Sequence, residues 1–378
     1  MNDIINVGTK DIGKDEPCFI IAEGGVNHNG SLDLAKKIVD KAAQAGVDAI
    51  KFQLFTAEEV CTKNVGMVDY QKENTGKAEA QIEMLRRLEL SYDNHIILQK
   101  YAEEKGLIFM SSAASLVSFK QLDDIHVPVF KVGSSDVTNM PYLKAMARTG
   151  KPIIFSTGMS NMNEVKQGVK WMTEEGNENI VVLQCTTNYP CPYEEANVSA
   201  MDSIEKETGC LVGYSDHTLT SLAAALAVNR GAVVVEKHFT LDKNMEGPDH
   251  KASVDPEELS ELVKVVRYVE KNKCDDEKLI DDINTKFNLN LEKENIAVIL
   301  GNGEKTRTTS EEKLVGIVRK SIVSTKEIKS GEKITEDMLS VKRPSFGIPP
   351  KDFFNVVGKN AKQDIPEDIT ITKEMVDW

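Results

Sequence analysis

Two lysines stand inside otherwise apolar runs of the sequence, Lys51 in AIKFQ and Lys131 in VFKVG. Burying a lysine costs much free energy unless its ammonium group faces an anion. With nearby amide and hydroxyl side chains, the two lysines could form a cradle for a phosphate or a carboxylate. These side chains are Gln53, Ser112, Ser134 and Ser156. Two alternatives stay open: each lysine pairs with an interior carboxylate, Glu23 or Glu236, or one of them forms a Schiff base.

Two histidines, His217 and His238, are separated by about the length of one strand and its following helix. If each follows a strand, their imidazoles lie side by side on one rim. With Glu23 nearby and water in open positions, two neutral imidazoles suit a divalent ion such as Mn²⁺, Fe²⁺, Zn²⁺ or Co²⁺. His28 and His250 are weaker candidates. The sequence has no HExxH motif and no nucleophile elbow, which argues against a zincin protease or an α/β-hydrolase.

Eight short β-rich runs, each followed by a polar turn and then an amphipathic stretch, are expected to position these side chains. The expected strands are 19–23, 49–53, 108–111, 129–132, 153–156, 180–184, 211–214 and 233–237. Eight such units match a (β/α)8 TIM barrel, in which polar residues at the C-terminal strand ends converge on one mouth. The alternative is an open doubly wound sheet, but no strand leads into a GxGxxG motif or a P-loop.

The pattern divides the chain into three parts. Residues 1–270 are expected to form the barrel, 271–315 a linker, and 316–378 a small β-rich domain with strands at 321–324, 339–342 and 368–372. Residues 271–295 are rich in Asp, Lys and Asn, which predicts a solvated connector with one weak helix. Residues 56–89 are too long for an ordinary loop, so we expect a lid or rim at the barrel mouth.

The chain has 378 residues and a formal net charge of −14, which repels nucleic acid and anionic membranes. No apolar run approaches the roughly 20 residues that span a bilayer, and the acidic start of the sequence lacks the basic region of a signal peptide. The six cysteines have no CxxC spacing and are expected to be reduced thiols. We therefore expect a cytoplasmic protein with neither a nucleic-acid nor a membrane partner.

Several ordered phrases resemble the sialic acid synthase family, whose members condense phosphoenolpyruvate with a 2-acetamido aldose. They include IIAEGGVNHNGSLDLAKKIVDKA, DAIKFQ, FKVGSSD, PIIFSTGM, LQCTTNYPCPYEEANVSAM, VGYSDHT and VVEKHFTLDKNMEGPDHKASVDPEEL. The tail, with SIVSTKEIKSGEKITEDMLSVKRPSFGIPP, resembles the antifreeze-like (SAF) domain of that family. The resemblance implies a TIM barrel followed by a SAF domain, in a homodimer that exchanges the small domains between its subunits.

The resemblance also implies roles for residues of this sequence. Phosphoenolpyruvate would bind Lys51, Gln53, Ser112, Lys131, Ser134, Ser156 and Ser215. The metal would bind His217 and His238, and is usually Mn²⁺, with Mg²⁺ or Co²⁺ as alternatives. The expected catalytic residues are Glu23, Tyr189 and Asp136. The expected sugar contacts are Asp136, Tyr189, Asp249, Arg343 and Phe346, with Arg343 supplied across the dimer.

The expected reaction joins phosphoenolpyruvate to an N-acetylmannosamine-type sugar, releases phosphate, and gives N-acetylneuraminate or a related nonulosonic acid. A 6-deoxy diacetamido sugar, which would give legionaminic or pseudaminic acid, is the alternative acceptor. Departures from the family pattern at residues 111–114 and at Phe346 leave the sugar open. In a different class, the chain could be a sugar- or ice-binding protein without catalysis, but the retained lysines and histidines argue against it. A metal-dependent aldolase or hydrolase that needs no phosphoenolpyruvate is a third alternative.

Overall fold

The structure is a computed structural model that describes residues 1–63, 65–76 and 79–378. Eight parallel strands close into a barrel in the order β10-β3-β4-β5-β6-β7-β8-β9. They are β3 (Phe19–Gly25), β4 (Ala49–Leu54), β5 (Ile108–Ala113), β6 (Phe130–Val132), β7 (Ile153–Ser156), β8 (Ile180–Cys185), β9 (Leu211–Asp216) and β10 (Val234–His238). The predicted TIM barrel is confirmed, and the strands differ from the expected ranges only at their ends.

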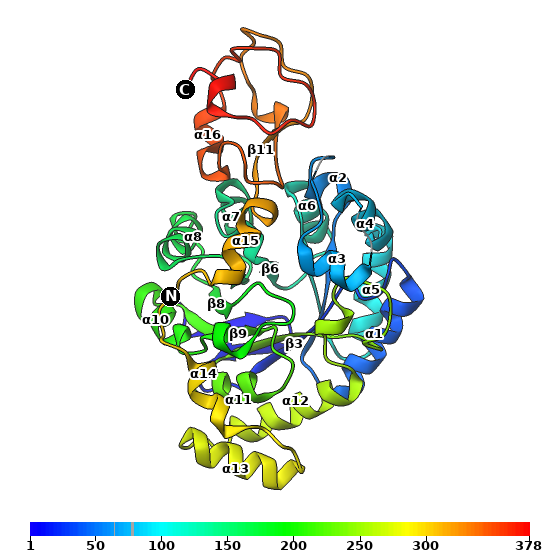
Figure 1. Ribbon diagram of the computed structural model, residues 1–378, viewed down its shortest axis with the longest axis vertical. Helices are drawn as coiled ribbons and strands as arrows, with labels where there is room; N and C mark the ends of the chain where they lie inside the picture. The colour runs from blue at the N-terminus through cyan, green and yellow to red at the C-terminus, as the bar shows by residue number, and fades with distance from the viewer. Residues whose placement is uncertain (64, 77–78) are drawn as a thin grey trace.

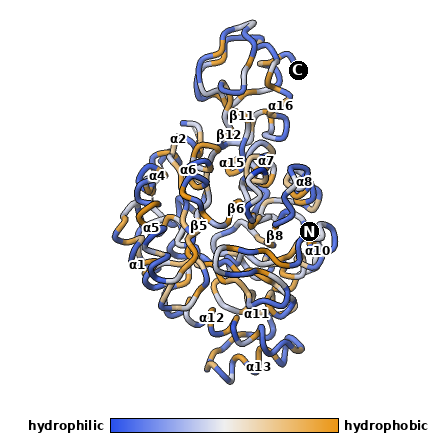
Figure 2. Tube along the Cα trace, turned by 180° about the vertical axis from the view of Figure 1, so that it is seen from behind, coloured by the Kyte–Doolittle hydropathy of each residue, from blue (hydrophilic) through white to orange (hydrophobic). Residues whose placement is uncertain are grey.

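One principal helix follows each barrel strand on the outside of the barrel (Figure 1). They are α1 (Leu32–Ala45), α5 (Tyr92–Glu104), α6 (Leu116–Asp124), α7 (Met140–Ala147), α8 (Met162–Glu174), α10 (Ala200–Thr208), α11 (Leu222–Asn229) and α12 (Pro256–Val269). Short polar residues cap them: the Ser31 side chain accepts the N–H of Leu34 at α1. Hydrophobic and hydrophilic residues alternate around the barrel (Figure 2), as expected for helices that bury one face.

Strand alternation decides which side chains face the barrel interior. In β4, Ala49 belongs to the interior cluster and Ile50 to the layer beneath the helices, so Lys51 faces inward. In β6, Phe130 packs beneath the helices, so Lys131 also faces inward. The inward positions are apolar near the N-terminal strand ends and polar near the C-terminal ends. Because side chains alternate between the two faces of each strand, the inward polar side chains all lie at one mouth of the barrel.

A hairpin that the sequence reasoning missed fills the opposite end of the barrel. It consists of β1 (Ile4–Val7) and β2 (Lys10–Gly13), paired antiparallel. Its side chains Ile5, Val7 and Ile12 are buried in the same cluster as the inward apolar residues of the strands. The barrel interior is thus packed at its N-terminal end.

The described residues of the segment 56–89, namely 56–63, 65–76 and 79–89, form a rim at the barrel mouth, as expected. They contain α2 (Ala57–Val60), α3 (Asp69–Thr75) and α4 (Gln81–Leu88). Apolar residues of α2 and α4, such as Val60 and Leu85, pack in one cluster with Val26 and Phe55 of the barrel loops. The rim therefore presents an apolar wall to the mouth.

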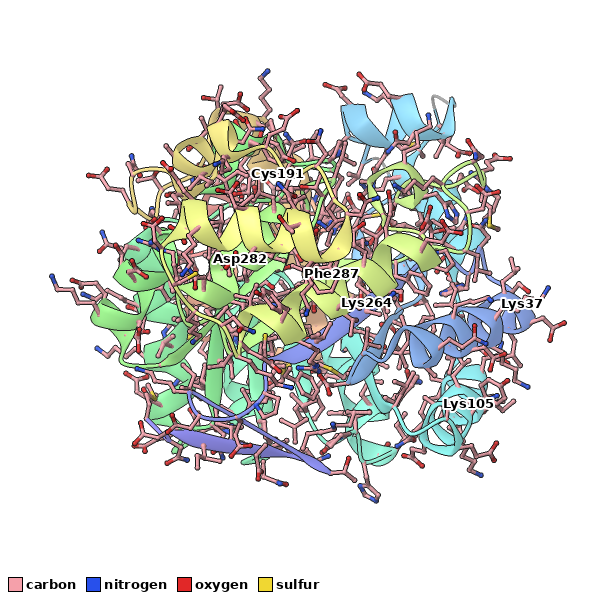
Figure 3. All side chains as sticks on the ribbon, turned by 90° about the horizontal axis from the view of Figure 1, so that it is seen from below. Lys37, Lys105, Cys191, Lys264, Asp282 and Phe287 are labelled. Carbon is pink, nitrogen blue, oxygen red and sulfur yellow. The ribbon has the colours of Figure 1, made fainter. Side chains whose placement is uncertain are left out.

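The one helix expected within 271–295 is present, but the prediction that this segment is solvated is wrong. The helix α13 (Asp276–Phe287) buries Leu279, Ile280 and Ile283 against the barrel helices. Its Phe287 ring lies 5.7 Å from the ring of Tyr268 in α12, and Figure 3 shows α13 beside α12 as seen from below. The charged residues that suggested solvation occupy the outer face of an amphipathic helix.

The rest of the chain runs along the barrel to a small domain. The further helices are α9 (Tyr193–Ala196), α14 (Ile296–Leu300), α15 (Thr309–Val318) and α16 (Phe353–Val356), and α15 crosses the expected boundary at residue 316. The small domain pairs β11 (Ser321–Ser324) with β12 (Leu339–Lys342) and has its own apolar cluster. The expected strand at 368–372 is reduced to an isolated bridge between Val323 and Thr370.

Six short 3-10 helices complete the secondary structure of the described ranges. They are η1 (Ser134–Asp136), η2 (His250–Ala252), η3 (Lys293–Asn295), η4 (Glu336–Met338), η5 (Pro350–Asp352) and η6 (Lys373–Met375). Among the described helices, none combines the length and the apolar character needed to cross a membrane.

The buried face of α13 gives a stability prediction. Ile283→Ala should lower the free energy of unfolding by about 2–5 kcal/mol, because it leaves a cavity where the side chain is fully buried. Thr285→Ala on the exposed face of the same helix is the control and should change stability little. Urea denaturation followed by circular dichroism measures both; equal small effects would mean that α13 is only loosely attached.

Candidate active site

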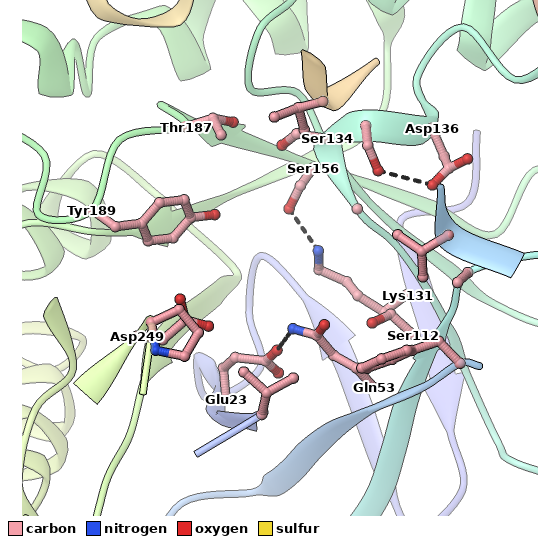
Figure 4. Close-up of a pocket in the computed structure, with 18 of the residues that line it drawn as sticks. Glu23, Gln53, Ser112, Lys131, Ser134, Asp136, Ser156, Thr187, Tyr189 and Asp249 are labelled. Atoms are coloured by element: carbon pink, nitrogen blue, oxygen red, sulfur yellow. Dashed lines mark hydrogen bonds between the residues drawn. The ribbon is translucent and has the colours of Figure 1, made fainter. Parts of the chain in front are cut away.

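One pocket at the C-terminal mouth of the barrel brings together the site residues predicted from the sequence, except Phe346 and the weaker metal candidates His28 and His250. Those that line it are Glu23, Lys51, Gln53, Ser112, Lys131, Ser134, Asp136, Ser156, Tyr189, Ser215, His217, His238, Asp249 and Arg343. Figure 4 shows several of them converging from different strands. The structure gives their positions, while their roles stay predictions.

The floor of the pocket is a buried set of two lysines and two carboxylates. The Nζ of Lys51 lies 2.5 Å from Glu23 Oε2 and 3.8 Å from Glu236 Oε2. The Nζ of Lys131 lies 3.5 Å from Glu236 Oε1 and donates to Ser156 Oγ at 2.7 Å. Figure 4 shows this last bond and the one from Gln53 Nε2 to Glu23 Oε1. The alternative of lysines paired with Glu23 and Glu236 is therefore present in the structure.

Burial and mutual attraction set the protonation of this floor. Burial raises the pKa of Glu23 to about 6, although Lys51 opposes this. Burial also opposes the charges of Lys51 and Glu236, but their ionic partners prevail: they raise the pKa of Lys51 and lower that of Glu236. Burial lowers the pKa of Lys131 against the attraction of Glu236. Glu23 is thus the floor carboxyl that takes up a proton most readily.

Hydroxyl and peptide groups form a cradle beside Lys131. Ser134 Oγ accepts the N–H of Gly158 at 2.9 Å. A Cβ at Gly158 would lie 2.1 Å from Thr187 Oγ1 and 2.7 Å from Ser134 Oγ, so only glycine allows this close approach. The Thr187 hydroxyl is buried, lines the pocket and has no hydrogen-bond partner within the described ranges. A buried polar group left in this state indicates a ligand or a water at the site.

The two imidazoles face one another across a short gap, with ring centroids 5.4 Å apart. His217 Nδ1 lies 2.6 Å from the carbonyl oxygen of Thr186; a proton on Nδ1 is donated to that oxygen, which makes Nε2 the nitrogen that could bind a metal. Burial lowers the pKa of His217, but the charge and the hydrogen bond of Cys185 outweigh it and raise that pKa. His238 Nδ1 is buried without a partner in the part of the chain that the structure describes. Burial, followed by the nearby cations, holds the pKa of His238 well below its usual value.

These features fit a divalent metal held by His217 and His238. An imidazole binds a metal in its neutral form. A buried ring nitrogen without a hydrogen-bond partner, such as His238 Nδ1, is expected where a metal ion normally binds. The described residues contain no group of three or more His, Cys, Asp or Glu side chains that could hold an ion. The imidazole pair would therefore leave most coordination positions to water and substrate.

Two further carboxyl groups line the pocket, Asp249 near His217 and Asp136 beside the small domain. Burial raises the pKa of Asp249 to about 6, and His217 opposes this. Asp136 Oδ1 lies 2.7 Å from the Nζ of Lys320, a buried residue directly before β11. The sequence reasoning missed Lys320, because polar residues flank it and only the packing of the small domain brings it to the barrel.

Arg343 lines the pocket of its own chain. Its peptide N–H donates to Val60 O at 3.0 Å, its carbonyl accepts from Thr62 N at 3.0 Å, and its side chain donates to Gln81. In this single chain, Arg343 lies at the chain's own pocket. Its supply by a partner subunit stays a prediction.

The expected contact of Phe346 with the sugar is not found in this chain, because the residue lies outside the pocket and is 70% exposed. Hydrogen bonds from Ser345 to the carbonyls of Val315 and Gly316 hold the segment on α15. The ring of Phe346 consequently lies over Gly316 instead of reaching toward a sugar.

The tight approach at Gly158 gives a binding prediction. Gly158→Ala should weaken binding of inorganic phosphate by at least about tenfold, because the new methyl displaces Ser134 and Thr187. Gly66→Ala is the control, since a Cβ there meets nothing within 4 Å and Gly66 does not line the pocket. Titration calorimetry measures both variants, and equal affinities would show that the cradle does not hold the anion.

Comparison with known proteins identifies the family of the barrel and of the small domain. Residues 38–278 match the NeuB family and residues 319–377 match the SAF domain. The chain is 40% identical to the N,N'-diacetyllegionaminic acid synthase of Campylobacter jejuni, over 93% of this chain and 97% of that protein. It is 37% identical to the human N-acetylneuraminate-9-phosphate synthase, over 97% of this chain and 94% of that protein.

Among solved structures, a spore coat polysaccharide biosynthesis protein of Bacillus subtilis superposes with a TM-score of 0.80 at 31% identity, covering 99% of both chains. The family match spans more than half of the chain, and the relatives cover nearly all of it. The chain therefore belongs to the NeuB family, with a SAF domain at its C-terminal end.

Proposed function

We propose that the protein condenses phosphoenolpyruvate with an open-chain 2-acetamido aldose and releases phosphate, giving a nonulosonic acid. The observation that carries the proposal is the pairing, in one pocket, of two buried lysines beside a hydroxyl cradle with two neighbouring imidazoles. Phosphoenolpyruvate offers a phosphate and a carboxylate, which match two cations and several hydrogen-bond donors. Its relatives include synthases of N,N'-diacetyllegionaminic acid and of N-acetylneuraminate 9-phosphate, as their names state.

The residues of the floor would hold the anion. Lys51, Lys131 and the cradle of Ser134, Ser156 and Gly158 would bind phosphoenolpyruvate, with Gln53, Ser112 and Ser215 at its edges. When the anion arrives, the lysines would exchange a carboxylate partner for a substrate oxygen. The pKa of Glu23, which burial raises to about 6, suits a carboxylate that later accepts a proton from water.

The reaction balances as phosphoenolpyruvate, aldose and water giving a nine-carbon 2-keto acid and phosphate. A divalent ion bound at His217 and His238, most simply Mn²⁺, would polarise the sugar aldehyde. C3 of phosphoenolpyruvate forms the new bond to the aldehyde carbon, water adds at C2, and the C–O bond to phosphate breaks. Glu23 would orient that water or accept its proton, and Tyr189, whose ring lies 4.2 Å from that of His217, would place the sugar.

We propose an unphosphorylated acceptor with an apolar substituent. Lys320 is paired with Asp136, and Asp249 adds a further carboxyl group to the pocket, which reduces the positive charge available to a second phosphate. The wall formed by the rim and the loops beside it is apolar and is lined by Val26, Phe55, Val60, Met84, Leu85 and Leu88. This wall suits the methyl group of a 6-deoxy diacetamido sugar better than the C6 hydroxyl of N-acetylmannosamine.

A cytoplasmic location is part of this proposal. Its support is that all six cysteines are free thiols, as in proteins of reducing compartments. Assembly into a homodimer that exchanges its small domains also stays a prediction.

The test offers phosphoenolpyruvate and Mn²⁺ with each candidate sugar and follows phosphate release together with the 2-keto acid. The 6-deoxy diacetamido sugar should give the highest kcat/KM, N-acetylmannosamine a lower one, and N-acetylmannosamine 6-phosphate little turnover. Prior chelation of divalent ions should abolish release. If no acceptor sugar stimulates phosphate release, the synthase proposal fails; if the phosphorylated sugar is preferred, the proposed acceptor is wrong.

A further inference from the structure

Glu311 joins the connector to two loops of the barrel mouth. It lies in α15, outside the barrel, and its side chain is fully buried. Its Oε1 accepts the peptide N–H of Met159 at 2.6 Å and that of Thr187 at 2.8 Å. Met159 follows β7 and Thr187 follows β8, so one carboxylate oxygen holds two neighbouring loops together. Such bonds to an ionised acceptor are among the stronger hydrogen bonds in proteins.

Two arginines of the same segment hold the other side of Met159. Its carbonyl oxygen accepts from Arg307 Nε at 2.9 Å and from Arg319 Nη2 at 2.7 Å. Met159 has a φ of 55°, a left-handed conformation that residues other than glycine rarely adopt. Three charged side chains from outside the barrel therefore hold an unfavourable backbone conformation in place.

The loops held in this way carry the anion cradle. Gly158, whose N–H donates to Ser134 Oγ, directly precedes Met159. Ser156, the hydroxyl that accepts from Lys131, lies three residues before Met159 in the sequence. The Thr187 hydroxyl that lacks a partner within the described ranges belongs to the second loop. A shift of either loop would move the cradle relative to the lysines.

We propose that Glu311 is a positioning residue for the anionic substrate: through the N–H groups of Met159 and Thr187, it sets the geometry of the cradle. The inference rests on the proposed function of the pocket. Loss of Glu311 leaves two buried N–H groups without an acceptor, and both belong to loops that touch the anion. The effect should therefore fall on affinity for phosphoenolpyruvate and leave affinity for the acceptor sugar unchanged.

Glu311 also has a purely structural role, which supplies the control. Its Oε2 accepts the N–H of Thr308 at 3.0 Å, and Thr308 Oγ1 accepts the N–H of Glu311 at 3.3 Å, a capping box at the start of α15. Thr308→Ala removes part of this cap without touching either barrel loop. It should lower thermal stability while leaving the KM for phosphoenolpyruvate unchanged.

The experiment compares Glu311→Ala, Glu311→Gln and Thr308→Ala with the unmodified chain. Glu311→Ala should raise the KM for phosphoenolpyruvate about 10- to 100-fold, with a smaller change in kcat and none in the KM for the sugar. Glu311→Gln, which keeps one acceptor oxygen, should fall between Glu311→Ala and the unmodified chain. Amide hydrogen exchange at Met159 and Thr187 should speed up in both Glu311 variants and stay unchanged in Thr308→Ala.

Binding of inorganic phosphate, followed by titration calorimetry, keeps the positioning role testable without turnover. If the unmodified chain shows no synthase activity with any sugar, the proposed function fails. A selective loss of phosphate binding in the Glu311 variants would still support the positioning role of Glu311. If Glu311→Ala and Glu311→Gln bind phosphate and phosphoenolpyruvate as tightly as Thr308→Ala does, the inference is overturned.

Discussion

The buried contacts of Lys51 and Lys131 with Glu23 and Glu236 are the constraint on which the rest of the structure depends. These four residues come from β4, β6, β3 and β10, so the set forms only when the barrel closes between its first and last strands. Removing one member leaves an uncompensated buried charge, which typically costs about 3–5 kcal/mol. A substrate anion that takes the place of a carboxylate partner keeps the charge of the lysine compensated, so the same set of charges suits binding as well as folding.

The barrel was predictable because it follows from a local rule. Strand alternation places Lys51 and Lys131 inward once the apolar neighbours of each are seen, and parallel strands bring their C-terminal ends to one mouth. The hairpin that carries Ile5 and Ile12 was missed because two short strands before the first barrel strand have no partner in the repeat. A weak helix was expected at α13, but its packing on the barrel was missed because its charges outnumber the few apolar residues that it buries.

The site residues that lie far from the barrel strands were harder to predict from the sequence than those at the strand ends. The strand-end residues were found because their spacing follows the strands. Lys320 and Glu311 lie in the connector and the start of the small domain, and the sequence order does not indicate which barrel loops they meet. Phe346 was placed at the sugar from its neighbour Arg343, but the bonds of Ser345 to α15 turn it outward. Contacts between the barrel and the small domain depend on tertiary packing, which the periodic pattern of apolar residues in the sequence does not predict.

The most direct test of the central claim is a crystal structure with phosphoenolpyruvate and Mn²⁺ bound. The account predicts that Lys51 and Lys131 each lie within hydrogen-bonding distance of a substrate oxygen, with Ser134 and the Gly158 N–H on the same anion. The contact between Lys51 and Glu23 or that between Lys131 and Glu236 should then have lengthened. A substrate bound elsewhere, with both lysines still on their carboxylates, would contradict the account.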